Sequence, residues 1–276
     1  MPRHLVIVRA GDNSLHTDWL GAEGERNWDI IVNYYGDNPD LYYDREQRRI
    51  DSKGPKWPAL YRLIADYRAD ILAYDYIWFP DDDLVTNATD INRLFTDMAE
   101  FNLQLAQPSL THDSIVGHPI TLTNKSFRLR YVTFVEIMAP CFSRAFMEHC
   151  WHTFNENVSG YGLDFLWPAM LERKDQVAII DEIAVKHTRA RGAQYAFFQN
   201  GQPSPDDELV ALVMKYKIRT IQMTYAGIDR ENNLDAIWND GRRRLIEKLI
   251  AGYLPELANH PQIIYKAIEP LFGISN

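Results

Sequence analysis

The sequence contains little cysteine, no long apolar run and no excess of positive charge. Its 276 residues include two cysteines, Cys141 and Cys150, whose spacing and apolar surroundings suit a reducing compartment better than a metal site. The formal net charge of -9 and the pI near 5.4 argue against binding to nucleic acid. No apolar stretch approaches the roughly 20 residues of a membrane span, and no signal peptide opens the chain. We therefore expect a cytoplasmic protein with at most peripheral contact to the inner face of the membrane.

Several signatures of common enzymes are also missing. The chain has no G-x-x-x-x-G-K loop, no complete G-x-G-x-x-G, no H-E-x-x-H and no G-x-S-x-G. These absences argue against P-loop NTPases, Rossmann dehydrogenases, zincins and α/β-hydrolases.

What is present is an alternation of short apolar runs with amphipathic segments. Residues 4–8, 28–35 and 76–79 are typical of buried strands, and residues 56–73 and a segment from about 87 are typical of helices. This alternation predicts an α/β fold that binds ligands at the carboxyl ends of its strands. We expect a catalytic domain over residues 1–200 and a helical C-terminal extension over 201–276, with helices from Glu208 and from Leu234.

An acidic triplet follows the predicted strand at 76–79. Asp81 and Asp83 are separated by one residue, so in an extended segment their side chains point the same way, whereas Asp82 points elsewhere. Carboxylates of this kind suit Mg²⁺ or Mn²⁺ bound to a phosphate. A solvated acidic turn is the alternative.

Basic and imidazole side chains follow other strands or turns. His187 ends an apolar run and can complete a mixed oxygen and nitrogen site, although most histidines have ordinary roles. Arg189 and Arg191 lie just beyond it and can clamp a diphosphate, or can simply be exposed on a loop. Lys53 can reach a phosphate or can solvate the start of a helix.

The middle of the chain contains a glycine-rich turn and two further carboxylates. Gly160, Tyr161 and Gly162 precede Asp164, which can be a general base for an incoming hydroxyl or the cap of a helix. Glu136 interrupts an otherwise apolar strand, so it either pairs within the protein or faces a cleft.

Four of these blocks, taken in order, resemble one family. "YDYIWFPDDDL", "VEIMAPCFSRAF", "SGYGLD" and the late "VKH" look like the conserved blocks of domain of unknown function 707, which is regarded as glycosyltransferase-like. The resemblance runs from about Lys53 to His187. The Asp-x-Asp at Asp81 to Asp83 also resembles the metal motif of GT-A glycosyltransferases.

The resemblance implies a GT-A-like, Rossmann-like fold with a mixed, mostly parallel sheet flanked by helices. It implies a metal-dependent glycosyltransferase that moves a sugar from a nucleotide-sugar donor, with UDP as the expected nucleotide, to a hydroxyl of a glycan or surface polysaccharide, and inversion is one outcome. The implied donor-binding residues are Arg9, Ala10, Gly11, Asp37, Lys53, Asp81, Asp82 and Arg189. The implied metal ligands for Mn²⁺ or Mg²⁺ are Asp81, Asp83 and His187. Asp164 would be the base, and Glu136, Gly160, Tyr161 and Gly162 would line the acceptor cleft. A nucleotidyltransferase and a non-catalytic nucleotide- or sugar-binding protein remain the alternatives.

Overall fold

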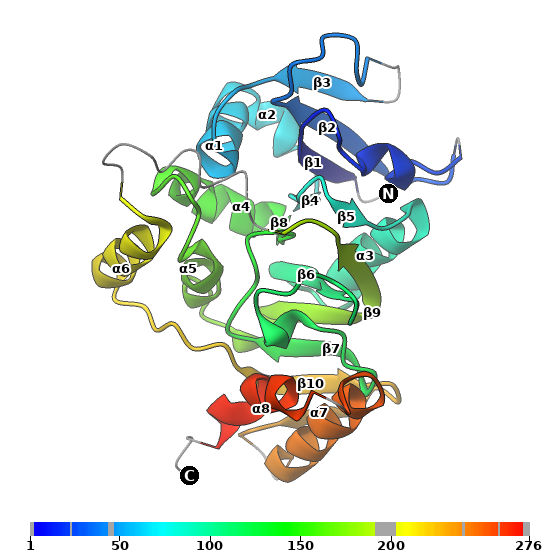
Figure 1. Ribbon diagram of the computed structural model, residues 1–276, viewed down its shortest axis with the longest axis vertical. Coiled ribbons are helices and arrows are strands. Elements are labelled where there is room, and N and C mark those ends of the chain that lie inside the picture. The colour runs from blue at the N-terminus through cyan, green and yellow to red at the C-terminus, as the bar shows by residue number, and fades with distance from the viewer. Residues whose placement is uncertain are drawn as a thin grey trace.

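The chain folds around one mixed β-sheet with helices packed on it, as the computed structural model in Figure 1 shows. The structure describes residues 3–22, 24–43, 47–190, 203–238, 241–258 and 260–272. The strands are β1 (His4–Ala10), β2 (Trp28–Tyr34), β3 (Arg48–Asp51), β4 (Tyr76–Trp78), β5 (Leu84–Val85), β6 (Leu105–Leu110), β7 (Phe127–Val132), β8 (Cys141–Ser143), β9 (Val177–His187), β10 (Thr224–Asp229) and β11 (Leu234–Ala236). The helices are α1 (Lys56–Asp66), α2 (Arg68–Ile71), α3 (Ala88–Glu100), α4 (Arg144–Cys150), α5 (Leu163–Ala169), α6 (Pro205–Tyr216), α7 (Arg242–Leu257) and α8 (Pro261–Ile268). The predicted α/β class is confirmed.

The order of the strands explains where a ligand can bind. The sheet runs β11-β10-β7-β9-β6-β8-β4-β1-β2-β3. β1 pairs in parallel with β2 and β4, and β2 pairs in parallel with β3. The carboxyl ends of these four strands therefore meet at one edge. β6 and β9 are also parallel, whereas β8, β7, β10 and β11 introduce antiparallel pairs.

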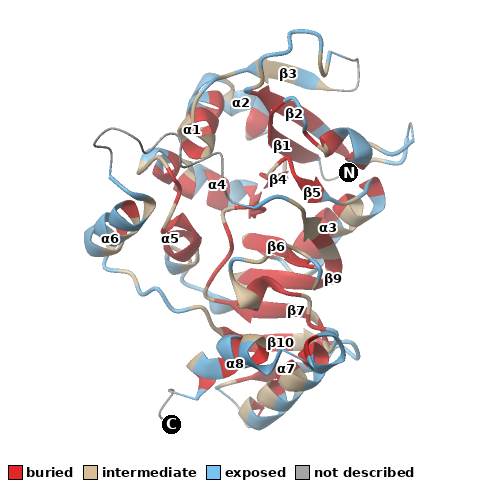
Figure 2. Cartoon of the chain, viewed as in Figure 1, coloured by how far each residue is buried: buried red, intermediate tan, exposed pale blue. Residues whose placement is uncertain are grey.

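Two apolar layers cover the faces of the sheet. Side chains alternate along β1, so Val6 and Val8 belong to one buried cluster and Leu5 and Ile7 to the other. The first cluster contains residues of α3, α7 and α8, and the second contains residues of α1, α4 and α5. The central strands between them are almost wholly buried, whereas the edge strand β3 is not (Figure 2). This three-layer arrangement accounts for strands that are apolar on both faces.

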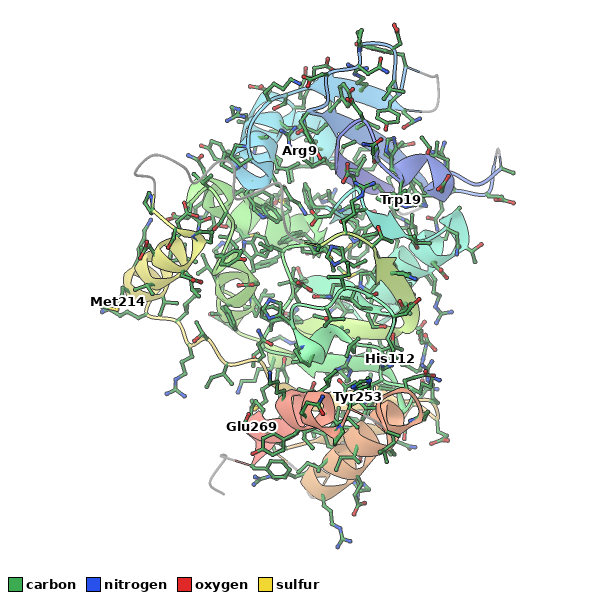
Figure 3. All side chains as sticks on the ribbon, viewed as in Figure 1. Arg9, Trp19, His112, Met214, Tyr253 and Glu269 are labelled. Atoms are coloured by element: carbon green, nitrogen blue, oxygen red, sulfur yellow. The ribbon has the colours of Figure 1, made fainter. Side chains whose placement is uncertain are left out.

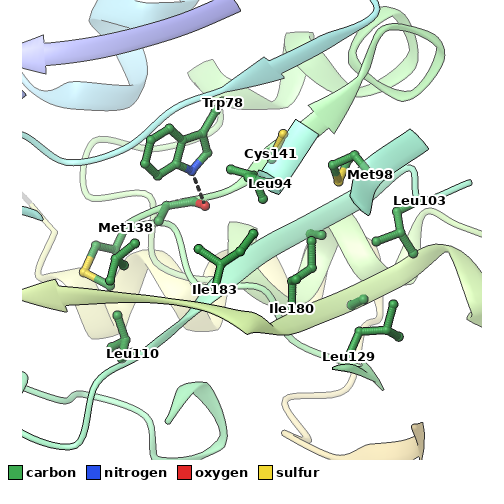
Figure 4. Packing of buried hydrophobic residues seen from close by; sticks show 14 of the residues in the cluster. Trp78, Leu94, Met98, Leu103, Leu110, Leu129, Met138, Cys141, Ile180 and Ile183 are labelled. Carbon is green, nitrogen blue, oxygen red and sulfur yellow. Dashed lines mark hydrogen bonds between the residues drawn. The ribbon is translucent and has the colours of Figure 1, made fainter. Parts of the chain in front are cut away.

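The strand before the acidic triplet is held between the two clusters, with Trp78 in the first and Ile77 in the second. The indole of Trp78 donates a hydrogen bond of 2.9 Å to the carbonyl of Ala139, close to Met138 and Ile183 (Figure 4). The helix after the triplet is α3, and Asn87 caps it by accepting from the amide of Asp90. The triplet thus lies between two firmly packed elements.

The segment after residue 200 is not purely helical. α6 confirms a helix that includes Glu208. The helix expected from Leu234 begins later, as α7 at Arg242, because Leu234–Ala236 forms a strand that pairs with β10. β10 in turn pairs with β7, so this segment extends the main sheet. The expected boundary near residue 200 lies outside the described residues.

A buried ion pair ties α7 to the sheet. Arg130 of β7 donates to Asp181 of β9 at 2.7 Å and to the hydroxyl of Tyr253 in α7, also at 2.7 Å. Both charged side chains are fully buried.

Within the described ranges, no helix combines the length and the apolar character that a membrane crossing requires.

β9 changes its partners along its length. Its first part pairs with β6 and β7, and the register against β6 shifts between Pro108 and Ser109. Its last part pairs with β5, where Leu84 lies opposite His187. This late pairing brings His187 to the acidic triplet.

Candidate functional site

One buried arginine joins the ends of β1 and β2 to the segment after β3. Arg9, labelled in Figure 3, donates to Asn33 Oδ1 at 2.8 Å, to the Ser52 carbonyl at 2.7 Å and to the Gly54 carbonyl at 2.6 Å. Burial lowers the pKa of Arg9 to about 10. Ala10 beside it is fully buried. Arg9 therefore shapes the floor of this edge through its bonds to the protein.

Asp37 and Lys53 meet at the exposed rim of the same edge. Lys53 Nζ lies 2.6 Å from Asp37 Oδ1 and also donates to the carbonyls of Tyr35 and Gly36. Asp12, which is not among the predicted donor-binding residues, accepts from the amides of Asp37 and Asn38. The predicted donor-binding residues are thus neighbours, and the pair at the rim is open to solvent.

The three carboxylates of the acidic triplet point to three different partners. Asp81 Oδ1 lies 2.5 Å from Lys56 Nζ, and Asp82 Oδ2 accepts from the amide of Gly11 at 2.8 Å. Asp83 Oδ2 lies 3.3 Å from His187 Nε2. The triplet is therefore part of the folded framework, which argues against a merely solvated turn.

Asp83 and His187 form the most suggestive pair of the site. His187 Nδ1 lies 2.7 Å from the carbonyl of Ile115, which directs Nε2 toward Asp83. The amide and hydroxyl of Thr188 both donate to the carbonyl of Asp83. Asp83 Oδ1 is buried and has no hydrogen-bond partner among the described residues. Buried polar atoms normally have partners, so this oxygen lacks one that a ligand can supply.

Burial and neighbouring charges shift the acidity of this group of residues. Burial raises the pKa of Asp82 to about 6 and also raises the pKa of Asp81, against the opposing charge of Lys56. Burial lowers the pKa of His187, but its hydrogen bonds to Asp83 and Ile115 outweigh burial and raise that pKa to about 9. Several carboxylates are thus close together where burial disfavours their ionised form.

Arg189 crosses over the same edge. Its guanidinium lies 3.5 Å from Asp82 Oδ1 and donates to the carbonyl of Asn13. It therefore links the segment after β9 to the loop after β1. Arg191, its predicted companion, lies outside the described residues.

Asp164 is buried at the start of α5. The cap of α5 is Gly162, with φ of +94°, so the expectation that Asp164 caps the helix is wrong. Asp164 is 7% exposed, and its Oδ1 has no hydrogen-bond partner in the described part of the chain. Burial, and then the nearby Glu136 carboxylate, raise the pKa of Asp164 to about 7, against backbone amides that lower it. A carboxyl group with such a pKa can take up a proton near neutral pH.

Glu136 lies between the two carboxylate regions. Its amide donates to Gln107 Oε1 at 2.5 Å, and its Oε1 lies 4.0 Å from His118 Nε2. The next residues, Ile137 and Met138, accept hydrogen bonds from Lys56 through their carbonyls. One short segment therefore joins the surroundings of Asp164 to those of Asp81.

A divalent cation is compatible with Asp83 and His187. No group of three His, Cys, Asp or Glu within the described ranges is arranged as a complete metal site, and Asp81 lies against Lys56. Mg²⁺ and Mn²⁺ commonly use one or two protein ligands together with water and substrate phosphates. The Oδ1 of Asp83, which lacks a hydrogen bond to the described residues, and the Nε2 of His187 suit that use. The role of Asp81 as a third ligand of the cation remains a prediction.

Two supporting residues could not be identified as such from the sequence. Lys56 contacts Asp81 and three backbone carbonyls, whereas its position after Gly54 and Pro55 predicts either a contact to a phosphate or the solvated start of a helix. Glu208 accepts from the amides of Val158 and Ser159 before the Asp164 turn. Acidic residues in a first helical turn are common, so no sequence signal marks this one.

Comparisons with known proteins agree with part of what the sequence predicts. The model of the family described as "Protein of unknown function (DUF707)" matches residues 123–222, which confirms the predicted resemblance over that part of the chain. The matched part includes Glu136, Asp164 and His187. No curated protein matches the chain.

Similar solved structures include two bacterial proteins with bound nucleotide sugars. One is residues 1–349 of TarS from S. aureus in complex with UDP-GlcNAc, at 12% identity and a TM-score of 0.44, with 96% of this chain and 71% of that chain covered. The other is glucosyl-3-phosphoglycerate synthase from Mycobacterium tuberculosis in complex with Mn²⁺, UDP-glucose and phosphoglyceric acid. Its identity is 14% and its TM-score 0.48, with 85% of this chain and 86% of that chain covered.

Proposed function

We propose that this protein is a metal-dependent glycosyltransferase that moves a sugar from a nucleotide-sugar donor, a UDP-sugar foremost, to a hydroxyl of a glycan. One observation carries the proposal: the buried Oδ1 of Asp83, which has no hydrogen-bond partner among the described residues, lies beside His187 Nε2 at the carboxyl edge of the sheet. The pair therefore places an oxygen that lacks a hydrogen bond and a nitrogen where ligands of α/β sheets bind.

The donor would lie along the loops after β1, β2 and β3. The bond from the Gly11 amide to Asp82 fixes the first loop against the acidic triplet. Lys53 and Arg189 add positive charge near this edge, which favours a diphosphate. Asp37, Arg9 and Ala10 complete the floor and rim on which we place the base and ribose.

The cation would be held by Asp83 and His187, with Asp81 as a further ligand. When bound, Mn²⁺ or Mg²⁺ would stabilise the negative charge of the departing diphosphate. The carbonyl of Ile115 holds the imidazole in the orientation that leaves Nε2 toward the site. Lys56 keeps Asp81 in place and supplies a positive charge of its own.

The acceptor would lie between Asp164 and Glu136. Asp164 would accept the proton of the attacking hydroxyl, and a pKa of about 7 makes it a stronger base than an ordinary aspartate. Gly160, Tyr161 and Gly162 would line this side of the cleft and allow close approach of the sugar. A base in this place favours transfer with inversion.

We further propose that residues 1–200 form the catalytic part and residues 201–276 an extension that completes the sheet. A cytoplasmic setting, with at most peripheral contact with a membrane, belongs to the same proposal.

A donor screen tests the function. The protein is incubated with Mn²⁺ and separate UDP- and GDP-sugars, and slow release of free sugar is followed, with Asp83→Asn as the matched control. Mn²⁺-dependent release by the wild type and its loss in the variant are expected. Release of pyrophosphate from nucleoside triphosphates would instead indicate a nucleotidyltransferase. Binding without turnover would indicate a binding protein.

A further inference from the structure

The turn that leads to Asp164 is fixed by its own hydrogen bonds. Asn157 Oδ1 accepts from the amide of Gly160 at 2.8 Å, and Asn157 Nδ2 donates to the carbonyl of Tyr161 at 2.8 Å. Ser159 Oγ accepts from the amide of Tyr161 at 3.0 Å. The turn is therefore a defined structure that ends at Gly162, the cap of α5.

A carboxyl group from a distant helix completes this structure. Glu208, in the first turn of α6, accepts from the amide of Val158 at 2.9 Å and from the amide of Ser159 at 2.8 Å. Glu208 is 8% exposed, which is unusual for a glutamate at a helix start. α6 lies beside α5 in Figure 1, although their sequences are separated by β9. One side chain therefore satisfies both backbone donors at the base of the turn.

α6 is well placed to act as a rigid support. Ser204 and Asp207 form a capping box at its start. Near its other end, Tyr216 donates to Glu156 at 2.6 Å, just before the turn. The outward side chain of Met214 is 73% exposed (Figure 3). α6 thus contacts the turn near both ends while its opposite face remains in solvent.

Two glycines show how closely the turn is enclosed. A Cβ on Gly160 would lie 2.2 Å from Cδ1 of Trp57 in α1, and a Cβ on Gly162 would lie 2.7 Å from Leu212 in α6. Both glycines have positive φ, of +83° and +94°. The turn is therefore clamped between α1 and α6, and a movement of α6 would be passed on to the first turn of α5.

We propose that Glu208 is a positioning residue that holds the first turn of α5 so that Asp164 faces the acceptor hydroxyl. This inference rests on the proposed function for its kinetic consequence. Glu208 itself touches no reacting atom. It acts by fixing the amides of Val158 and Ser159, and through them the backbone that carries Asp164.

The two acceptor oxygens of Glu208 set the expected effects. Glu208→Ala removes both acceptors, whereas Glu208→Gln keeps one oxygen and so keeps one of the two bonds. A displacement of about 1 Å at a reacting group lowers a rate by about 10²-fold. We expect kcat for sugar transfer to fall by about 10²-fold in Glu208→Ala and by about tenfold in Glu208→Gln. UDP affinity and donor KM should change by less than about twofold, because the donor edge is made by other elements.

The matched control is Asp207→Asn. It removes a charge from the adjacent residue of the same helix, but Asp207 contacts Ser204 and not the turn. It should leave kcat unchanged. Near-ultraviolet circular dichroism on all variants checks that each is folded.

A double-mutant cycle separates positioning from a merely structural role. In an Asp164→Asn background, Glu208→Ala should lower kcat by less than about twofold, because the group that Glu208 positions is already gone. An equal loss in both backgrounds, or no loss in the single variant, would overturn the proposal.

Hydrogen exchange gives a readout that does not need activity. The amides of residues 158–164 should exchange faster in Glu208→Ala than in Asp207→Asn, with an intermediate effect in Glu208→Gln. Unchanged exchange would overturn the positioning role even if transfer is observed. Faster exchange in a protein that transfers no sugar would support the positioning of the turn and refute the proposed function instead.

Discussion

The raised pKa of Asp164 makes a quantitative prediction about the dependence of turnover on pH. A base works only when it is ionised, so kcat should fall as pH falls through about 7, the pKa of Asp164. Between pH 8 and pH 5 the ionised fraction of such a group falls by about one hundredfold. An aspartate with the usual value of 3.8 would remain largely ionised over the same range. The shape of this profile therefore distinguishes the buried carboxyl from an ordinary one.

The assay is transfer at saturating donor and Mn²⁺, from pH 5 to pH 9. UDP affinity is measured at every pH in parallel, because protonation of His187 would weaken cation binding and must be separated from the loss of a base. Asp164→Asn should lower kcat by about 10² to 10⁴-fold at pH 8 and abolish the acid limb. A flat profile in the wild type, or full turnover in Asp164→Asn, would refute the base assignment and with it the argument for inversion.

The same group should influence stability with a definite sign. Since the folded state raises the pKa of Asp164, its contribution to stability is greatest below pH 4 and is lost as pH rises through about 7. Asparagine does not titrate, so Asp164→Asn should not lose this contribution. Between pH 4 and pH 8, the free energy of unfolding of the wild type should therefore fall relative to that of the variant by up to about 4 kcal/mol. Urea unfolding at both pH values measures the difference. A constant difference would show that the pKa of Asp164 is not raised.

Three further predictions concern the donor edge and the core. Calorimetry should find that UDP binding depends on Mn²⁺ in the wild type. Asp83→Asn should lose more of this dependence than Asp82→Asn. The opposite order would refute the role of Asp83 as a ligand of the cation. Gly160→Ala should cost about 1–3 kcal/mol in urea unfolding, because its Cβ would overlap a tryptophan ring at positive φ, and an unchanged midpoint would contradict this. Arg130→Met should cost about 3–5 kcal/mol, because Asp181 would remain buried without its partner; a loss below about 1 kcal/mol would show that water or another group replaces the arginine.

The sequence was sufficient to predict which strand ends would converge. Asp81 to Asp83 follow β4, and residues after β1, β2 and β3 meet them because parallel strands end at one edge. The apolar run before each of these residues predicts a strand and the point at which that strand ends. Whether these residues bind a donor and a cation remains a prediction.

The partner of each carboxylate could not be predicted in the same way. Alternation along an extended strand describes residues within β4, but the acidic triplet follows that strand. There Lys56 sets the direction of Asp81, Gly11 that of Asp82 and His187 that of Asp83. Such contacts depend on segments that are far apart in the sequence. The strand at 234–236 was missed for a related reason, since its pairing with β10 outweighs the local helical pattern.

The irregularity within β9 constrains which insertions and deletions this chain can accept. Pro108 lies opposite Ile180 and Ser109 opposite Ala184, so Asp181, Glu182 and Ile183 have no counterparts in β6. Successive side chains of a strand face opposite ways, so the loss of one residue here would turn His187 away from Asp83 while the first part of β9 kept its place. Loss of two residues would preserve the facing. Related chains that keep this histidine beside the acidic triplet should therefore differ in this short segment by even numbers of residues, a parity that can be checked from sequences alone.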